Sequence, residues 1–155
     1  MKITTQITMK TIEARLQWSL AAAAAVALAL CTPAVAQTPS PPGAKVYIIS
    51  PKNNATVAAP FLVQFGLSGM GVAPAGIEKE KTGHHHILID TKLSAEEMKA
   101  PLPADPKHVH FGAGQTEAMV TLAKGKHTLQ LVLGDQNHIP HNPPVMSQVI
   151  TVTVK

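Results

Sequence analysis

The chain has 155 residues, a formal net charge of +4 and one cysteine, Cys31. This weak charge, together with an aromatic content of 3%, excludes the basic surface with stacking groups that nucleic-acid-binding domains need. The length is sufficient for one domain with a modest core.

The first 36 residues have the pattern of a signal peptide. Lys2, Lys10 and Arg15 form a basic start, and an almost wholly apolar run follows from Trp18 to Cys31. The small-x-small sequence at 34–36 (AVA) is typical of signal peptidase sites. We therefore expect cleavage after Ala36 and a periplasmic location for residues 37–155.

Two alternatives to cleavage after Ala36 are less favoured. An uncleaved anchor is one, but the apolar run is shorter than the ~20 residues that span a bilayer comfortably. Lipid attachment at Cys31 is the other, but Leu30 stands where a lipidation motif needs Gly or Ala.

Removal of residues 1–36 leaves a chain without cysteine, tryptophan or arginine. It also leaves 10 lysines against 8 acidic residues, because Lys2, Lys10, Arg15 and Glu13 depart with the signal. Disulfides, thiolate chemistry and cysteine-based zinc sites are therefore excluded for the mature chain.

Residues 37–44 (QTPSPPGA) predict a mobile, Pro-rich tether, and residues 45–155 predict a single domain. Strands are expected at 45–50, 60–67, 84–91, 115–123, 126–134 and 146–155, with a short extended piece at 108–111. Ser94 and Glu97 form a capping-box pattern that indicates one or two helical turns over 94–99. This order favours an all-β fold, an immunoglobulin-like antiparallel β-sandwich of about seven strands with one short helical insert.

All eight histidines lie between residues 84 and 141, so all belong to the mature domain. Residues two apart on a strand project to the same side, so His84 and His86 should project together, as should His108 and His110. Two imidazoles on one face can converge on one ion, because zinc and copper bind nitrogen at about 2 Å. A Pro-stiffened loop, residues 135–141, adds His138 and His141.

The predicted ligands of a zinc or copper ion are therefore six histidines: His84, His86, His108, His110, His138 and His141. Asp135, Gln115 and Glu117 are the expected second layer, where acidic or amide groups orient imidazoles. No catalytic residue is assigned. His85 and His127 alternate with apolar residues and favour structural roles. Met70 and Met146 lie near loops, where a thioether would favour copper(I), although packing is the more frequent role of methionine.

Three runs of the sequence resemble a known bacterial exported family. They are 83–90 (GHHHILID), 110–117 (HFGAGQTE) and 127–141 (HTLQLVLGDQNHIPH). The chain is similar over nearly all of 46–154 to the family catalogued as domain of unknown function 4399. The resemblance implies a small exported β-domain with a His/Gln/Asp signature, and it supplies no activity.

The sequence supports three hypotheses of different classes. The first is a periplasmic metal-binding protein for copper or zinc, whose partners are the ion and, for a delivery role, another periplasmic protein. The second is a metal-dependent enzyme with Glu117 or Asp135 beside a bound water. The third is a non-catalytic envelope interaction module whose histidines hold loops by hydrogen bonds. Convergence of the ring nitrogens separates the first two from the third.

Overall fold

The structure is a computed structural model that describes residues 37–155. The predicted signal peptide, residues 1–36, and its cleavage after Ala36 lie outside the described residues. Within the described part, no helix has the length and hydrophobicity to span a bilayer.

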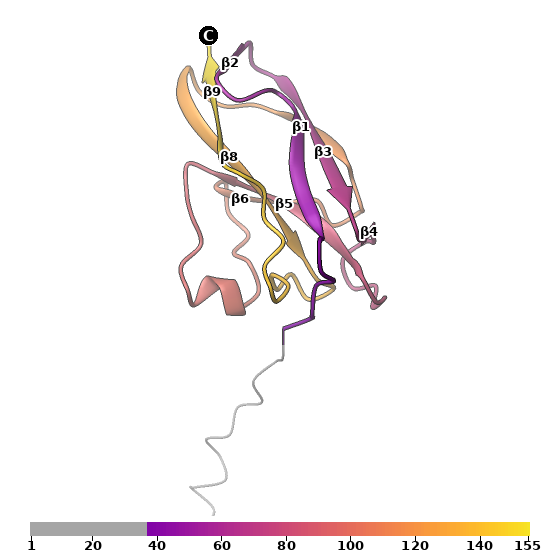
Figure 1. The fold of residues 1–155 in the computed structure, drawn as a ribbon. Helices are drawn as coiled ribbons and strands as arrows, with labels where there is room; N and C mark the ends of the chain where they lie inside the picture. The colour runs from indigo at the N-terminus through magenta and orange to yellow at the C-terminus, as the bar shows by residue number, and fades with distance from the viewer. Residues whose placement is uncertain (1–36) are drawn as a thin grey trace, which may run out of the picture. The chain divides into compact units, whose positions relative to one another are not determined.

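Residues 37–155 form short strands and one 3₁₀ turn (Figure 1). The elements are β1 (Lys45–Ser50), β2 (Ala55–Val57), β3 (Phe61–Ser68), β4 (Gly71–Val72), β5 (Thr82–Ile89), η1 (Glu97–Lys99), β6 (His108–His110), β7 (Glu117–Val120), β8 (Gly125–Gly134) and β9 (Ile150–Val154). All seven predicted extended segments contain a strand. The two short strands β2 and β4 lie outside the segments predicted as strands.

The strands make two sheets that pack as a sandwich. One sheet has the order β1-β3-β7, and the other has the order β2-β9-β8-β5-β4. The short strand β6 belongs to the larger sheet and pairs only with β5. The prediction of an all-β sandwich with one short helical insert is confirmed. The expected antiparallel pairing holds for most neighbours, whereas β2 pairs with β9 and β4 pairs with β5 in parallel.

The main core lies between the two sheets, and β5 shows how alternation builds it. Ile87 and Ile89 of β5 join the apolar cluster that contains Val63 and Phe65 of β3. Leu88, which lies between them in the sequence, belongs instead to a second apolar cluster. The even-numbered side chains of β5 therefore point to the outer face of the larger sheet.

That outer face is covered by the long connection between β5 and β6. Leu93 and Leu102 of the connection pack with Leu88 of β5 and Val132 of β8. Every residue of β5 after Thr82 is consequently buried, on both faces of the sheet. The outer face is thus a sheltered surface on which polar side chains of β5 are removed from bulk water.

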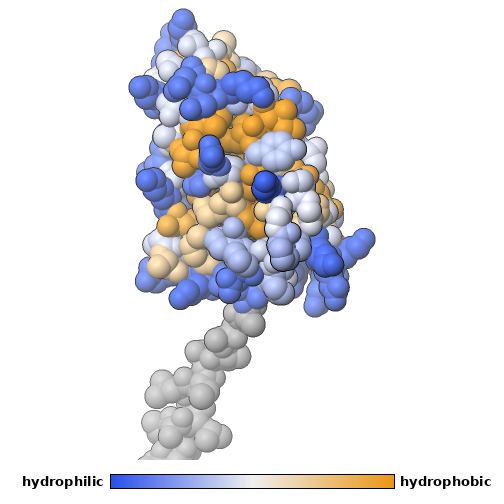
Figure 2. Space-filling view, in the orientation of Figure 1, coloured by the Kyte–Doolittle hydropathy of each residue, from blue (hydrophilic) through white to orange (hydrophobic). Residues whose placement is uncertain are grey.

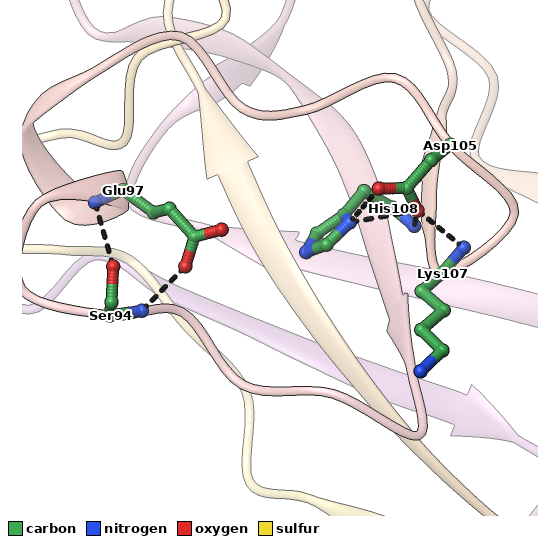
Figure 3. Close-up of polar contacts among 5 residues, drawn as sticks. All are labelled: Ser94, Glu97, Asp105, Lys107 and His108. Carbon is green, nitrogen blue, oxygen red and sulfur yellow. Dashed lines mark hydrogen bonds and ion pairs between the residues drawn. The ribbon is translucent and has the colours of Figure 1, made fainter.

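The capping box predicted in this connection is present (Figure 3). The backbone N–H of Ser94 donates to Oε2 of Glu97 at 2.7 Å, and the backbone N–H of Glu97 donates to Oγ of Ser94 at 3.2 Å. The turn that follows is shorter than expected, because only Glu97–Lys99 is helical and Pro101 and Pro103 come directly after it.

The segment 37–43 differs from the predicted mobile tether, because it is hydrogen-bonded to the domain. The backbone N–H of Asn142 donates to the carbonyl of Thr38 at 3.0 Å, and that of Ser40 donates to the carbonyl of Asn142 at 3.1 Å. The side-chain amide of Gln37 donates to the carbonyls of Met98 and Pro140. The composition of this segment could not reveal these partners, because they lie about 60–100 residues away along the chain.

Apolar side chains also reach the surface beside β1, which is an edge strand. A groove runs between β1 and the segment 144–150. Figure 2 shows apolar residues gathered over the upper part of the face on which β1 and β3 are seen in Figure 1.

Candidate metal centre

Four histidines converge on the outer face of the larger sheet. His84 and His86 project from β5, His110 projects from β6, and His138 comes from the loop after β8. Strand pairing places His110 directly opposite His86. Each ring offers one nitrogen, and these four nitrogens all lie within 4.8 Å of one another. We call this group the histidine cluster.

The shortest separations within the histidine cluster match those of a coordinated set. Nε2 of His86 lies 3.0 Å from Nε2 of His84, which in turn lies 3.2 Å from Nδ1 of His138. Tetrahedral zinc with bonds of 2.0–2.1 Å requires its nitrogens to be about 3.3 Å apart. These two separations are therefore already close to those between ligands of one ion.

Two glycines leave the space that the rings occupy. A Cβ added at Gly134 would lie 2.9 Å from Nε2 of His86, and a Cβ added at Gly112 would overlap the ring of His110. Any other residue at either position would displace a cluster imidazole. Gly112 and Gly134 are thus site residues that the sequence reasoning missed, although Gly112 lies two residues after His110 and Gly134 ends the strand next to His84.

The outer ring nitrogens of the β5 pair have no partner among the described residues. Nδ1 of His84 and Nδ1 of His86 are buried and make no hydrogen bond. Packing, rather than a hydrogen bond, therefore holds the Nδ1 side of these two rings. If Nε2 of one ring donates to Nε2 of the other, the acceptor ring carries its own proton on a buried Nδ1 without an acceptor. Such an unmade hydrogen bond costs about 1–3 kcal/mol.

Burial and crowding keep the imidazoles of His84, His86 and His110 neutral. Burial, together with the smaller effects of the neighbouring rings of His138 and His110, lowers the pKa of His84 to about 4. Burial also lowers the pKa of His86, and that of His110 to a lesser extent, again with a contribution from neighbouring rings. At neutral pH these rings therefore present free lone pairs, which is the form that binds a metal ion.

The histidine cluster is closed on one side and open on the other. His84 and His86 are 0% and 1% exposed, whereas His110 is exposed and His138 is half-buried. An ion held here would be shielded by the sheet and reached from the side of His110. This asymmetry permits exchange of the ion with solvent or with another protein.

The loop that carries His138 is organised by Asp135. Oδ1 of Asp135 accepts hydrogen bonds from the backbone N–H groups of Asn137 at 2.9 Å and Ile139 at 3.0 Å. The backbone N–H of His138 donates to the carbonyl of Asp135, and the φ angle of His138 is 66°, in the left-handed region. Asp135 therefore positions His138 through the backbone, and its carboxylate does not contact the imidazole.

His108 lies outside the histidine cluster, which corrects its assignment as a shared ligand. Its Nδ1 is 2.9 Å from both carboxylate oxygens of Asp105, and the backbone N–H of His108 donates to the same carboxylate (Figure 3). This contact lowers the pKa of Asp105. His108 is paired in the sheet with Leu88 rather than with a cluster histidine, so its ring belongs to the apolar part of the outer face.

His141 also lies outside the cluster, so the loop contributes one ring and not two. Its Nδ1 is 3.2 Å from the carbonyl oxygen of Leu133, and its Nε2 is 3.2 Å from that of Thr82. The buried ring thus bridges the ends of β8 and β5. Both nitrogens face backbone oxygens, which corrects the expectation that His141 is a ligand of the same ion.

The two histidines expected to be structural both have structural contacts. His85 packs against the ring of Phe65 with centroids 5.1 Å apart, and its Nδ1 is 3.2 Å from the carbonyl oxygen of Gln115. His127 pairs with Asp90, whose Oδ2 is 2.7 Å from Nδ1. That hydrogen bond raises the pKa of His127.

The other residues expected near the ion have different partners. Oε1 of Gln115 accepts from the backbone N–H of Ala113, and Oε2 of Glu117 accepts from the amide of Gln64 in the smaller sheet. Met70 packs against the main core and Met146 against the second apolar cluster, so both serve as packing residues.

The fold and the site together define a class of protein, a small β-sandwich that gathers four imidazoles on the outer face of one sheet. No curated protein and no solved structure matches the chain. The chain belongs to the family described as "Domain of unknown function (DUF4399)", whose profile matches residues 63–155. The match confirms the resemblance noted in the sequence, and it includes all four members of the histidine cluster.

Proposed function

We propose that this chain is an exported metal-binding protein that holds a copper or zinc ion at the histidine cluster in the periplasm. The observation that carries the proposal is the convergence of four ring nitrogens to within 4.8 Å of one another. They come from two strands and a loop that are distant along the chain, so the fold has to bring them together.

The chemistry of the donors favours these metals. All four donors are imidazole nitrogens, and the mature chain has no cysteine to offer a thiolate. Imidazole suits zinc and copper, whereas calcium and magnesium prefer oxygen. Four neutral donors leave the positive charge of the ion uncompensated. The ion could therefore also bind an anion, a water or a ligand from a partner protein on the open side of the cluster.

A role in carrying or delivering the ion fits the half-open geometry. His84 and His86 would hold the ion from the buried side, while His110 and His138 face the side from which it can enter or leave. A partner in delivery would be another periplasmic protein that approaches this side. The signal-peptide pattern of residues 1–36 is the support for the periplasmic location.

A metal-dependent enzyme is the second candidate, and the open side of the cluster is the observation that favours it. An ion bound by three histidines with water at a fourth position can generate a nucleophile. The two acids considered for the base are otherwise engaged, since Asp135 accepts backbone hydrogen bonds and Glu117 bonds Gln64 on the other sheet. Metal binding without catalysis is therefore the preferred function.

Metal analysis with competition titration tests the proposal. The purified protein, stripped of metal, is titrated with Zn²⁺ and with Cu²⁺ against a chelator of known affinity. We expect one ion per chain and loss of uptake in the double variant H84A/H86A, with uptake retained in the control H127A. Absence of stoichiometric binding by the unaltered protein would refute the proposed function.

A further inference from the structure

The segment just after the predicted cleavage site is tied to the loop that carries His138. The hydroxyl of Thr38 donates to Oδ2 of Asp135 at 2.7 Å, and the other oxygen of that carboxylate accepts the backbone N–H groups of Asn137 and Ile139. These two residues flank His138. One carboxylate therefore links the N-terminal segment to the turn that presents the imidazole.

The same segment holds the loop at further points. The carbonyl of Thr38 accepts from the backbone N–H of Asn142, and the amide of Gln37 donates to the carbonyls of Pro140 at 2.9 Å and Met98 at 2.7 Å. The backbone N–H of Leu102 donates to the carbonyl of His138 at 3.0 Å. Residues 37–40 and 98–102 thus hold the loop 135–142, which carries His138, by hydrogen bonds to its backbone.

His138 needs such support more than the other cluster members do. The rings of His84, His86 and His110 project from paired strands, whereas His138 sits in a turn with a positive φ angle of 66°. A left-handed backbone is uncommon for a residue with a side chain and persists where the surroundings hold it. Without its ties, the turn could relax and carry the imidazole away from the other three.

We propose that Thr38 is a positioning residue of the metal centre, which acts through Asp135 to hold the His138 turn in its ligating conformation. The inference rests on the proposed metal-binding function. It assigns to the N-terminal segment of the mature chain a part in ion affinity. Outer partners of this kind typically alter metal affinity by about 10- to 100-fold.

The test uses two substitutions of Thr38 and one of Ser40 in the purified protein. T38V removes the hydroxyl while keeping the shape, T38S restores a hydroxyl, and S40A removes a neighbouring hydrogen bond to the carbonyl of Pro143 that does not reach Asp135. We expect T38V to weaken Zn²⁺ and Cu²⁺ affinity by about tenfold. T38S and S40A should stay within about twofold of the unaltered protein.

A double-variant cycle separates positioning from general destabilisation. If Thr38 acts through His138, T38V should have no further effect on affinity in an H138A background. The Cu²⁺ electron paramagnetic resonance spectrum of T38V should also shift toward that of H138A. A merely structural role would lower the melting temperature without changing the spectrum.

The outcomes separate this inference from the function on which it rests. Metal binding by the unaltered protein with equal affinity in T38V would overturn the role of Thr38 and leave the metal centre intact. An additive effect of T38V and H138A would also overturn it. Absence of metal binding by the unaltered protein would overturn both.

Discussion

The eight histidines of the chain form two sets that differ in what their ring nitrogens face. In the histidine cluster, imidazoles face one another and no carboxylate belongs to the group. Outside it, each ring has an oxygen partner: His85 with Gln115, His108 with Asp105, His127 with Asp90 and His141 with Leu133 and Thr82. A ring beside an oxygen is fixed by a hydrogen bond. Rings whose only neighbours of this kind are other imidazoles direct their lone pairs at one place.

His84 of the cluster and His127 outside it also differ in how they hold protons. Burial moves the pKa of His84 down to about 4, while the hydrogen bond to Asp90 moves the pKa of His127 up from the same ordinary value of 6.5. Low proton affinity combined with convergence is what a metal site requires, because protons and the ion compete for the same lone pairs. The comparison therefore predicts different consequences of substitution in each set.

The largest contrast should come from His86→Ala. His86 supplies a buried nitrogen 3.0 Å from that of His84, so its removal deletes a ligand from the closed side of the cluster. We expect Zn²⁺ and Cu²⁺ affinity to fall by about 100-fold or more, above the effect of outer partners. Competition titration measures the affinity, and the rise in melting temperature on adding metal should shrink in parallel.

The matched control for His86→Ala is His127→Ala, in the set outside the cluster. Its ring bonds Asp90 and the carbonyl of Ala123, and neither residue belongs to the cluster. Metal affinity should stay within about twofold. Equal losses in the two variants would show that the comparison between the sets has no bearing on metal binding.

Acid sensitivity of the metal-free protein is the second contrast. An unfolded chain protonates His84 near pH 6.5, whereas the folded chain resists protonation until about pH 4. Between these values the unfolded state binds more protons, so the free energy of unfolding falls as the pH falls. Urea unfolding measured at intervals from pH 7.5 to pH 4 should show this decline.

Variant H84F, which replaces the buried ring with one that does not titrate, serves as the control for acid sensitivity. Its free energy of unfolding should fall less steeply over the same pH range, even if its value at pH 7 differs. Identical slopes for H84F and the unaltered chain would contradict the assignment of the acid sensitivity to His84.

The sequence was sufficient to find the strand half of the cluster. The spacing His84-x-His86 places two rings on one face of any strand, and the burial of Ile87 and Ile89 on the other side follows from the same alternation. The outward direction of the pair was harder to predict, because β5 is buried on both faces. That burial depends on the connection folding back over the sheet, which no local pattern encodes.

The choices within the pairs 108/110 and 138/141 could not be made from the sequence. His108 and His110 share a face, but the strand register places His110 opposite His86 and His108 opposite Leu88. The ring of His108 is hydrogen-bonded to Asp105 there. In the loop, the left-handed turn at His138 directs one ring to the cluster while His141 bridges two strand ends. Register and turn conformation are tertiary outcomes, so spacing alone left both members of each pair as candidates.

A smaller effect is expected when a ligand is displaced rather than removed. In Gly134→Ala, the new Cβ would lie 2.9 Å from Nε2 of His86, so the ring or the strand has to shift. We expect metal affinity to fall by about tenfold, comparable to the loss of an outer partner. Gly71→Ala is the control, because its Cβ would meet only a methyl group of Thr82 at 3.4 Å. Equal affinities for the two variants would mean that Gly134 leaves more room than the cluster needs.

The smallest effect should appear in the set outside the cluster, with His127→Gln. The raised pKa of His127 means that its charged form is stabilised in the folded state by Asp90. This contribution is fully present below pH 6.5, the pKa of the residue in the unfolded chain. It is lost as the pH rises through the higher pKa of the folded state. Because the pair is near the surface, the loss of unfolding free energy at pH 5.5 should be no more than about 1 kcal/mol and should shrink toward pH 9. Urea unfolding of both proteins at the two pH values measures it. A difference that grows with pH would reverse the sign and would place His127 with His84 and His86, whose neutral form the fold prefers.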